Sequence, residues 1–133
     1  MANYYTKTQV DALLAAICTE NRFTQVSAGW GYTGGVKSDG TVACWGRNDF
    51  GQSTPPEGTF TQVASGGGYH TCGVKSDGTV ACWGENGYGQ SAPPAGTFTQ
   101  VTAGAWHTCG VKTDGTVACW GDNSAGQSTP PQP

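Results

Sequence analysis

The sequence has 133 residues, including 22 glycines and 7 prolines, and carries a formal net charge of −3. Charged residues make up only 11% of it and its 6 basic residues stand singly, which excludes a basic nucleic-acid-binding surface and a highly charged disordered chain. No apolar run approaches the roughly 18 residues of a membrane-spanning helix, so membrane insertion is excluded, and the length favours a single domain.

The first element is a short helix predicted over residues 8–18. Thr6 or Thr8 can cap its N-terminus, and Asp11 lies in the first turn, where the helix dipole favours an acid. Its apolar residues recur at helical spacing and form one stripe, made of Val10, Leu13, Leu14 and Ile17. The stripe predicts either packing on a neighbouring sheet or association with other subunits. The residues before it lack the basic start and apolar centre of a signal peptide.

Three repeats follow this N-terminal segment of residues 1–22. Each begins with the string F-T-Q-V and runs through G-V-K-[ST]-D-G-T-V-A-C-W-G to a tail that ends in two prolines. The repeats cover residues 23–59, 60–97 and 98–133. Each contains short β-prone runs separated by turn residues. Small sheets recurring at such a period predict an all-β fold of propeller blades.

Within each repeat a hairpin turns at a Ser/Thr-Asp-Gly sequence, such as residues 76–78. The glycine occupies the position that needs a positive φ, and the aspartate is a typical turn residue, as at Asp39, Asp77 and Asp114. If Lys75 faces Thr79 across this turn, the register brings cysteines together at non-hydrogen-bonded pairs, where side chains are closest. The pairs are Cys72 with Cys82 and Cys109 with Cys119. Disulfides there indicate an oxidising environment.

A metal site is the alternative for these cysteines. His70 alternates onto the same strand face as Cys72, with Cys82 opposite, so three ligand types that suit zinc converge. The third repeat offers the same set through its own histidine, His107. Each set lacks an evident fourth ligand. We therefore predict disulfides beside a histidine that packs between blades, and no metal or other cofactor.

The first repeat departs from this pattern. Tyr32 replaces the histidine and Gly34 replaces the cysteine opposite Cys44. The remaining unmatched cysteine is Cys18, which predicts a Cys18–Cys44 bridge, within or between chains, or else two free buried thiols. Because the first repeat differs here, we expect Trp30 and Tyr32 to lie at an interface between subunits.

A tryptophan recurs on the opposite face of each hairpin, at Trp45, Trp83 and Trp120. Threonines stand across from these indoles, and nearby glycines leave room for them, which predicts packing between blades: Thr33, Thr71, Thr108, Gly35, Gly73 and Gly110. Trp30 and Trp106 are less periodic and more exposed. Asparagines with neighbouring glutamines are expected to hold the loops by backbone hydrogen bonds. With Trp106 they could instead form a ligand-binding rim: Asn48, Asn86 and Asn123.

The string G-x-x-H-T-C-G-V-K-[ST]-D-G-T-V-A-C-W-G-x-N-x-x-G-Q resembles the repeat of the regulator of chromosome condensation family. The resemblance rests on residues such as His70, Asp77, Gly78, Trp83 and Asn86, and on their partners in the third repeat. It implies a β-propeller, which in that family usually has seven blades. Three blades form only an arc with two open faces. We predict completion by further copies of the chain as a ring, a trimer or a filament.

The segment from Tyr4 to Leu14 is similar to sequences near the start of bacteriophage tail-fibre and related virion proteins, where such helices join identical subunits. This resemblance implies a virion or extracellular location. The sequence shows no nucleophile–base–acid set and no phosphate-binding loop, so we expect no enzyme. The predicted function is a self-assembling virion structural or adhesion protein that could bind a host-surface glycan or protein. A secreted bacterial protein- or glycan-binding module and a filament subunit are the alternatives.

Overall fold

A computed structural model describes residues 6–10 and 22–131 of the chain. Residues 7–10 are helical, and Thr6 is the capping residue of the two considered. Gln9 donates its backbone N–H to the Thr6 hydroxyl at 3.1 Å, and its side-chain oxygen accepts the Thr6 backbone N–H at 2.8 Å. This reciprocal pair is a capping box. The rest of the predicted helix, including Leu13, Leu14, Ile17 and Cys18, lies outside the described residues.

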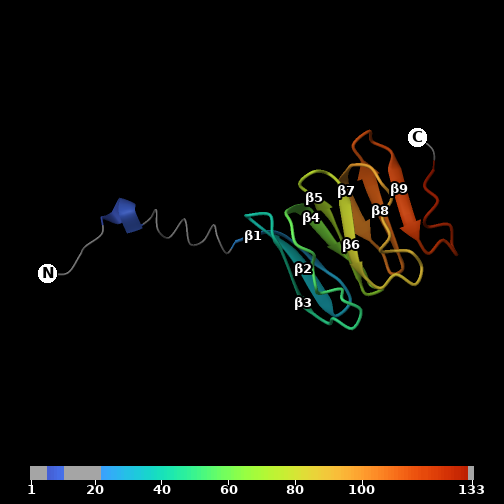
Figure 1. Ribbon diagram of the computed structural model, residues 1–133, viewed down its shortest axis with the longest axis horizontal. Helices are drawn as coiled ribbons and strands as arrows, with labels where there is room; N and C mark the ends of the chain where they lie inside the picture. The colour runs from blue at the N-terminus through green and yellow to red at the C-terminus, as the bar shows by residue number, and fades with distance from the viewer. Residues whose placement is uncertain (1–5, 11–21, 132–133) are drawn as a thin grey trace.

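The remaining described residues form nine strands in three separate antiparallel sheets (Figure 1). Each sheet arises within one repeat and has three strands in sequence order. The strands are β1 Phe23–Ala28, β2 Tyr32–Lys37, β3 Val42–Gly46, β4 Phe60–Ser65, β5 His70–Lys75, β6 Val80–Gly84, β7 Phe98–Ala103, β8 His107–Lys112 and β9 Val117–Gly121. The predicted all-β fold of three propeller-like blades is confirmed, and within the described residues the blades form an open arc.

The hairpin register agrees with the prediction. Gly78 has a φ of 90°, which an L side chain rarely adopts, and Lys75 donates its backbone N–H to the Thr79 carbonyl at 2.8 Å. Asp77 accepts both the backbone N–H and the hydroxyl of Thr79, as an Asx-type turn requires. The same turn recurs in all three blades. It therefore sets Val74 opposite Val80 and Cys72 opposite Cys82.

The turns of blades 1 and 2 also position the blade that follows each of them. Phe60 donates its backbone N–H to the Gly40 carbonyl at 2.7 Å, and Phe98 bonds in the same way to Gly78. A side chain at Gly40 would approach the Cβ of Thr59 to 3.0 Å. The turn glycines therefore serve both the hairpin and the contact with the strand that follows.

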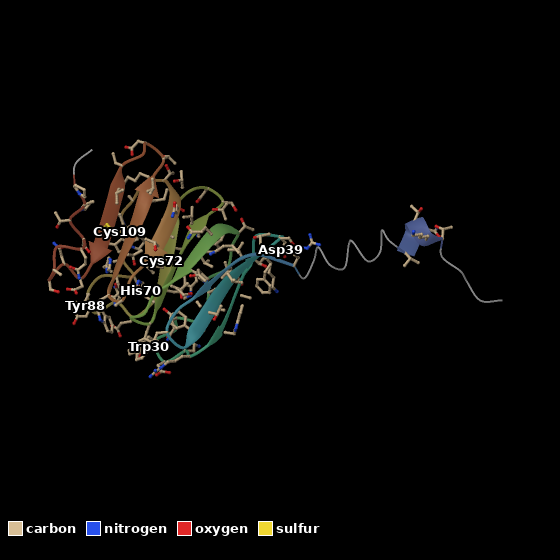
Figure 2. All side chains as sticks on the ribbon, turned by 180° about the vertical axis from the view of Figure 1, so that it is seen from behind. Trp30, Asp39, His70, Cys72, Tyr88 and Cys109 are labelled. Carbon is tan, nitrogen blue, oxygen red and sulfur yellow. A yellow bond between two sulfur atoms is a disulfide. The ribbon has the colours of Figure 1, made fainter. Side chains whose placement is uncertain are left out.

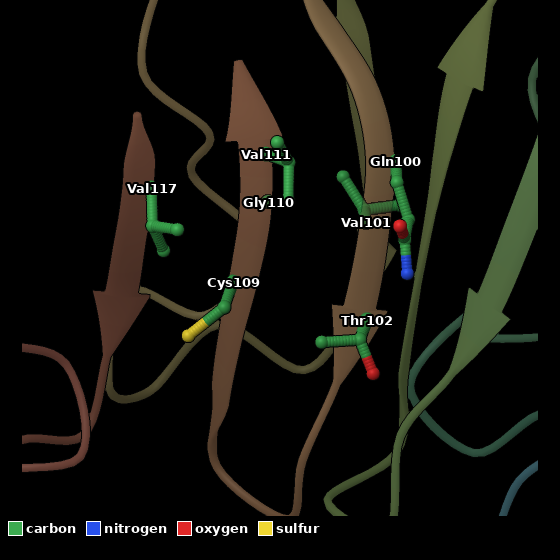
Figure 3. Close-up of a pocket in the computed structure, with 7 residues that line it drawn as sticks. All are labelled: Gln100, Val101, Thr102, Cys109, Gly110, Val111 and Val117. Carbon is green, nitrogen blue, oxygen red and sulfur yellow. The ribbon is translucent and has the colours of Figure 1, made fainter. Parts of the chain in front are cut away.

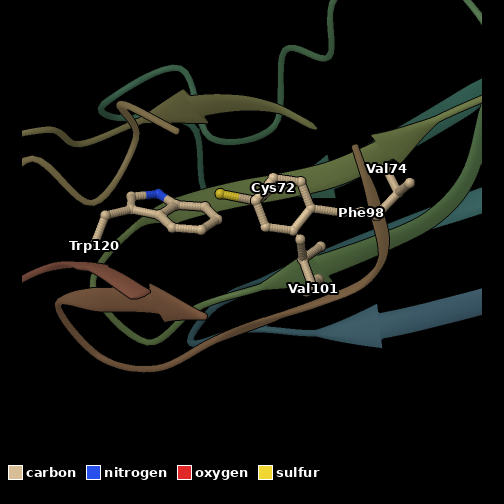
Figure 4. Close-up of a cluster of buried hydrophobic side chains, with 6 residues drawn as sticks. Cys72, Val74, Phe98, Val101 and Trp120 are labelled. Atoms are coloured by element: carbon tan, nitrogen blue, oxygen red, sulfur yellow. The ribbon is translucent and has the colours of Figure 1, made fainter. Parts of the chain in front are cut away.

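The core lies between the blades. One buried cluster joins blades 1 and 2 around Phe60, Val63 and Trp83, and a second joins blades 2 and 3 around Phe98, Val101 and Trp120. Figure 4 shows Trp120 and Phe98 of the third blade meeting Cys72 of the second. One prediction is corrected here. The glycines beside the tryptophans give room to phenylalanine rings, because a side chain at Gly73 would lie 2.7 Å from the Phe60 ring.

Candidate functional site

The junctions between neighbouring blades contain polar contacts that recur from one junction to the next. At the first junction Gln25 donates its side-chain amide to the Val63 carbonyl at 2.7 Å and accepts the Val63 backbone N–H at 2.8 Å. Gln62 makes the same two bonds to Val101 at the second junction, both at 2.7 Å. Each blade therefore holds the backbone of the next one through a glutamine, which we call the glutamine clamp.

A second recurring contact links the hairpin tryptophans of blades 2 and 3 to the preceding blade. Trp83 donates its indole N–H to the Gln52 carbonyl at 2.9 Å, and the Thr71 hydroxyl donates to the same oxygen at 3.0 Å. Both donors lie on the blade face that meets the preceding blade, which we call the leading face. The opposite face, which meets the following blade, is the trailing face. The same bonds recur one blade later, from Trp120 and Thr108 to the carbonyl of Gln90.

The junction between blades 2 and 3 contains the predicted histidine and disulfide (Figure 2). Cys72 is bonded to Cys82, with their Cα atoms 4.0 Å apart, and Cys109 is bonded to Cys119 in the same way. His70 is fully buried, and its Nε2 lies 2.9 Å from the Thr108 hydroxyl of the next blade. Because the sulfurs are consumed in disulfides, they are not thiolate ligands for zinc.

Burial lowers the pKa of His70 from 6.5 to about 4, because the apolar junction disfavours the imidazolium. In the unfolded chain the histidine binds a proton below its ordinary pKa, so between about pH 6.5 and 4 the unfolded state holds more protons. We expect the free energy of unfolding to fall by about 3 kcal/mol as the pH drops through this window.

Urea denaturation across that pH range measures this loss. His70→Gln should remove most of the pH dependence. His107→Gln, which changes the equivalent half-buried side chain of the third blade, should retain it. An unchanged slope in His70→Gln would show that other groups cause the dependence.

The junction between blades 1 and 2 uses different residues. Tyr32 is only 3% exposed, and its hydroxyl bonds to the carbonyls of Gly66 and His70 in the second blade. This corrects the assignment of Tyr32 to a subunit interface, because a side chain held between two blades of one chain has no surface left for another copy. Desolvation raises its pKa to about 12.

Cys44 lies half-buried near this junction, opposite Gly34, and forms no disulfide with another described cysteine. Burial raises the pKa of its thiol to about 11, so little of it is the reactive thiolate at neutral pH. The predicted partner Cys18 lies outside the described residues. The Cys18–Cys44 bridge therefore stays a prediction.

The two ends of the arc have no blade against them within the described chain. On the trailing face of blade 3 a cavity of about 210 Å³ opens over Gln100, Cys109, Val111 and Val117 (Figure 3). On the leading face of blade 1, Phe23, Val26 and Trp45 are exposed. Trp45 is 47% exposed, whereas its counterparts Trp83 and Trp120 are each 9% exposed. The same tryptophan therefore recurs in all three repeats, and its exposure depends on whether a neighbouring blade covers it.

The loop asparagines act mainly within their own loops. Asn48 accepts the Ser53 backbone N–H at 2.9 Å and donates to the Thr54 hydroxyl, and Asn123 repeats this with Ser128 and Thr129. In the middle blade Asn86 accepts the Ser91 N–H in the same way. The glutamines complete each loop, for example where Gln52 accepts the Phe50 N–H. The loop-holding role predicted for these residues is confirmed.

Sequence reasoning missed the glutamine clamp and part of an aromatic row. The clamp residues are the third letter of every F-T-Q-V string, an uncharged polar side chain repeated at one strand position, which was the available signal. Trp30 and Trp106 were expected to be exposed, and they are. Their neighbours in the row are Phe50, Tyr69 and Tyr88. Phe50 and Tyr88 occupy equivalent loop positions, which was the signal for them.

The described residues contain no helix that could cross a membrane, and no cluster of three or more His, Cys, Asp or Glu residues placed to hold a metal. The two disulfides indicate an oxidising environment.

A sequence profile described as the regulator of chromosome condensation (RCC1) repeat matches residues 23–52, 60–90 and 98–127. No curated protein shows a significant match to the chain. Among solved structures, the CRINKLY WD40 ectodomain of the Arabidopsis thaliana receptor kinase ACR4 is 31% identical with a TM-score of 0.64, over 77% of this chain and 37% of that one.

Two further structures are similar in fold at lower identity. Yeast RCC1 (Prp20), solved bound to Kap60, is 17% identical with a TM-score of 0.66, over 77% of this chain and 32% of that one. The C-terminal domain of gp131 from bacteriophage phiKZ is 17% identical with a TM-score of 0.55, over 98% of this chain and 48% of that one. The chain therefore spans between about a third and a half of the length of these three structures.

Proposed function

The chain belongs to the family of regulator of chromosome condensation repeats, and we propose that it acts without catalysis as a self-assembling structural or adhesion protein of a virion. Copies join head to tail, with the trailing face of blade 3 against the leading face of blade 1 in the next copy. The observation that carries this proposal is that the two open faces contain the contact residues of the chain's own blade junctions.

The polar contacts have their counterparts on the two faces. Gln100 stands where Gln25 and Gln62 stand, and its side chain bonds to no other described residue. Val26 takes the place of Val63 and Val101 on the leading face. A glutamine clamp from Gln100 to the Val26 backbone of the next copy therefore repeats the two internal clamps. Trp45 and Thr33 then donate to the carbonyl of Gln127, as their equivalents do to Gln52 and Gln90.

The apolar contacts are complementary as well. Trp45 meets Phe23 edge to face at 5.8 Å, the arrangement that Trp83 and Trp120 make with their own phenylalanines inside the core. The cavity over Val111 and Val117 is the position that these rings fill at the internal junctions. Because the third blade has His107 and a disulfide, the joint between copies should resemble the junction of blades 2 and 3. Exposed apolar faces of this kind are typical of association sites.

Head-to-tail joining closes into a ring only when the rotation between copies permits it, and otherwise gives a filament. With three blades in each chain, rings grow by whole chains, so two copies give six blades and three give nine. Known propellers have about four to eight blades. Two copies are therefore the smallest assembly that reaches the usual range.

The virion location draws on three observations. The segment from Tyr4 to Leu14 is similar to the start of phage tail-fibre proteins, and the same fold occurs in a domain of a phage protein. The disulfides fit a protein that works outside the reducing cytoplasm. Mass spectrometry of purified phage particles from the source of this sequence should detect its peptides at a stoichiometry well above contaminant level. Their absence from particles would refute the virion role.

Light scattering tests the assembly directly. The protein should have a mass that is a multiple of the 13.7 kDa chain. Gln100→Glu should convert it to single chains, because the carboxylate lacks the amide N–H for Val26 and adds a charge that would be buried in the joint. Loss of such a bond costs about 2 kcal/mol or more.

Thr99→Glu is the matched control, because it adds the same charge at the neighbouring exposed residue and should leave the assembly intact. A monomeric wild-type protein would refute head-to-tail joining. Equal effects of the two substitutions would place the interface elsewhere.

A further inference from the structure

Five aromatic side chains form a row along one rim of the arc. They come from the loops between the first and second strands of the three blades and from the loops that follow β3 and β6. We call this the aromatic rim. Trp30 and Tyr88 lie on this rim, while Asp39 lies at the opposite end of its blade (Figure 2). Trp30 is 67% exposed and Tyr88 57%. The rim consists of Trp30, Phe50, Tyr69, Tyr88 and Trp106.

The rings hold one another in a continuous series. Tyr69 is at the centre, stacked on Trp30 with ring centroids 6.0 Å apart and on Phe50 at 5.4 Å. On its other side it meets Trp106 edge to face at 6.4 Å, and Trp106 contacts Tyr88 at 5.6 Å. Residues from all three blades contribute, yet every ring belongs to one chain. The rim is therefore pre-organised without help from another subunit.

Tyr69 is held in an unfavourable backbone conformation. Its φ is 64°, and it is the only described non-glycine residue with a positive φ. Such a conformation in a bulky residue is unusual, costs of the order of 1–3 kcal/mol and is concentrated at binding and active sites. The guanidinium of Arg47 lies 4.7 Å from the Tyr69 ring centroid and fixes the ring from a third direction. The fold thus holds the Tyr69 ring at the rim although a tyrosine backbone disfavours a positive φ.

Polar groups border the rings. Asn86 differs from its counterparts in the other blades, because Ala92 stands where a threonine accepts their side-chain amide. Its amide N–H2 therefore has no partner among the described residues and lies two residues from Tyr88. Arg47 and Asp49 form an ion pair at 2.9 Å, so their charges largely cancel. The border provides hydrogen-bonding groups without a strong charge.

A cavity of about 600 Å³ lies next to the row, with Trp30 in its wall. The rest of its lining is small residues from the inner strands and their loops, such as Gly67 and Ala105. Ser65 also lines it, and this buried side chain has a hydroxyl with no hydrogen-bond partner in the described part of the chain. The hollow is shallow and open, and its lining is both polar and apolar, so it can take part of a ligand that lies along the row.

We infer that the aromatic rim binds a neutral oligosaccharide, with sugar rings laid on the exposed rings of Trp30 and Trp106. A pyranose ring has C–H groups on its faces and hydroxyls at its edge, which suits exposed aromatic faces bordered by amide and hydroxyl groups. An anionic glycan or a nucleic acid would need cationic side chains, and the rim has Arg47 alone, already paired with Asp49. This inference rests on the binding role proposed above and names its ligand class.

The test uses intrinsic tryptophan fluorescence and affinity electrophoresis of the full chain with cellohexaose, chitohexaose, mannohexaose and heparin. At least one neutral oligosaccharide should bind, and heparin should not. Trp30→Ala and Trp106→Ala should each weaken binding by about tenfold or more, a loss of about 1.4 kcal/mol. Thr99→Glu is the control, because this exposed residue lies outside the proposed joint and near the start of β7, the end of that strand away from the rim. Its affinity for the oligosaccharide should be unchanged.

The inference would be overturned if the protein bound none of the neutral glycans, or if both rim variants kept the wild-type affinity. It would also be overturned if the protein bound only a host protein from which the glycans had been removed. The same measurement on the Gln100→Glu variant separates it from self-assembly. Because the rim lies within one chain, a single chain should keep its affinity for the soluble oligosaccharide. Glycan binding by a chain that never assembles would support the rim and refute the assembly, and an assembly that binds no glycan would do the reverse.

Discussion

Replacing Trp83 with alanine is expected to lower the free energy of unfolding by about 3–5 kcal/mol, whereas replacing Trp45 should lower it by about 1 kcal/mol or less. The two residues occupy the same position in successive repeats, opposite a threonine in the same hairpin. Trp83 fills the junction between blades 1 and 2 and bonds to the Gln52 carbonyl. Trp45 has no described blade in front of it and packs on Phe23 of its own blade.

Urea denaturation in the Gln100→Glu background measures this difference, because single chains report only the stability of the arc itself. A loss of several kcal/mol is a large part of the 5–15 kcal/mol typical of folded domains, so Trp83→Phe provides a milder variant that keeps a ring in the junction. Equal losses for Trp83→Ala and Trp45→Ala would contradict the view that the core lies between blades.

Removing either disulfide should destabilise the chain by about 3 kcal/mol, since both bonds close rings of the same length. The double substitution at Cys72 and Cys82 should cost about 1 kcal/mol more than the one at Cys109 and Cys119. Cys72 is fully buried against Phe98 and Trp120 of the next blade, so its sulfur is also lost from the core. Cys109 lies on the open trailing face.

Alanine variants of each pair, compared with Cys44→Ala, test this. The Cys44 variant removes one unpaired thiol and opens no ring, so it should have a smaller effect than either pair. Treating the wild-type protein with reductant should reproduce the combined loss. If both double variants unfold at the wild-type urea concentration, the bonds add nothing to the stability of the blades.

The strands within each blade were predictable because local chemistry determines them. The Asp-Gly turn set the register, and that register placed Cys72 opposite Cys82 and Trp83 opposite Thr71. The contacts between blades were not predictable, since they depend on the angle at which two sheets meet. Gln62 reads as an ordinary outward-facing residue of an alternating strand, and only a neighbouring sheet makes it a clamp.

Two particular errors have the same origin. Tyr32 looked like a surface change in the first repeat, but its longer side chain reaches across to the carbonyls of the second blade. Gly73 looked like space for an indole, but the bulge between Phe60 and Gln62 brings the phenylalanine ring over it instead. Part of the aromatic rim escaped notice for a further reason, because Tyr69 and Phe50 meet only through loops of different blades.

The glutamine clamp recognises main-chain N–H and carbonyl groups, which every residue but proline possesses. The clamp itself places no requirement on the side chain of the clamped residue, but that position is buried and needs an apolar residue such as Val63 or Val101. A repeat that keeps both features can be duplicated or deleted without redesign of its neighbours. The two ends of the chain keep their complementarity whatever the number of repeats between them. Duplication or deletion of repeats can therefore lengthen or shorten this protein by whole units while its mode of joining is inherited unchanged.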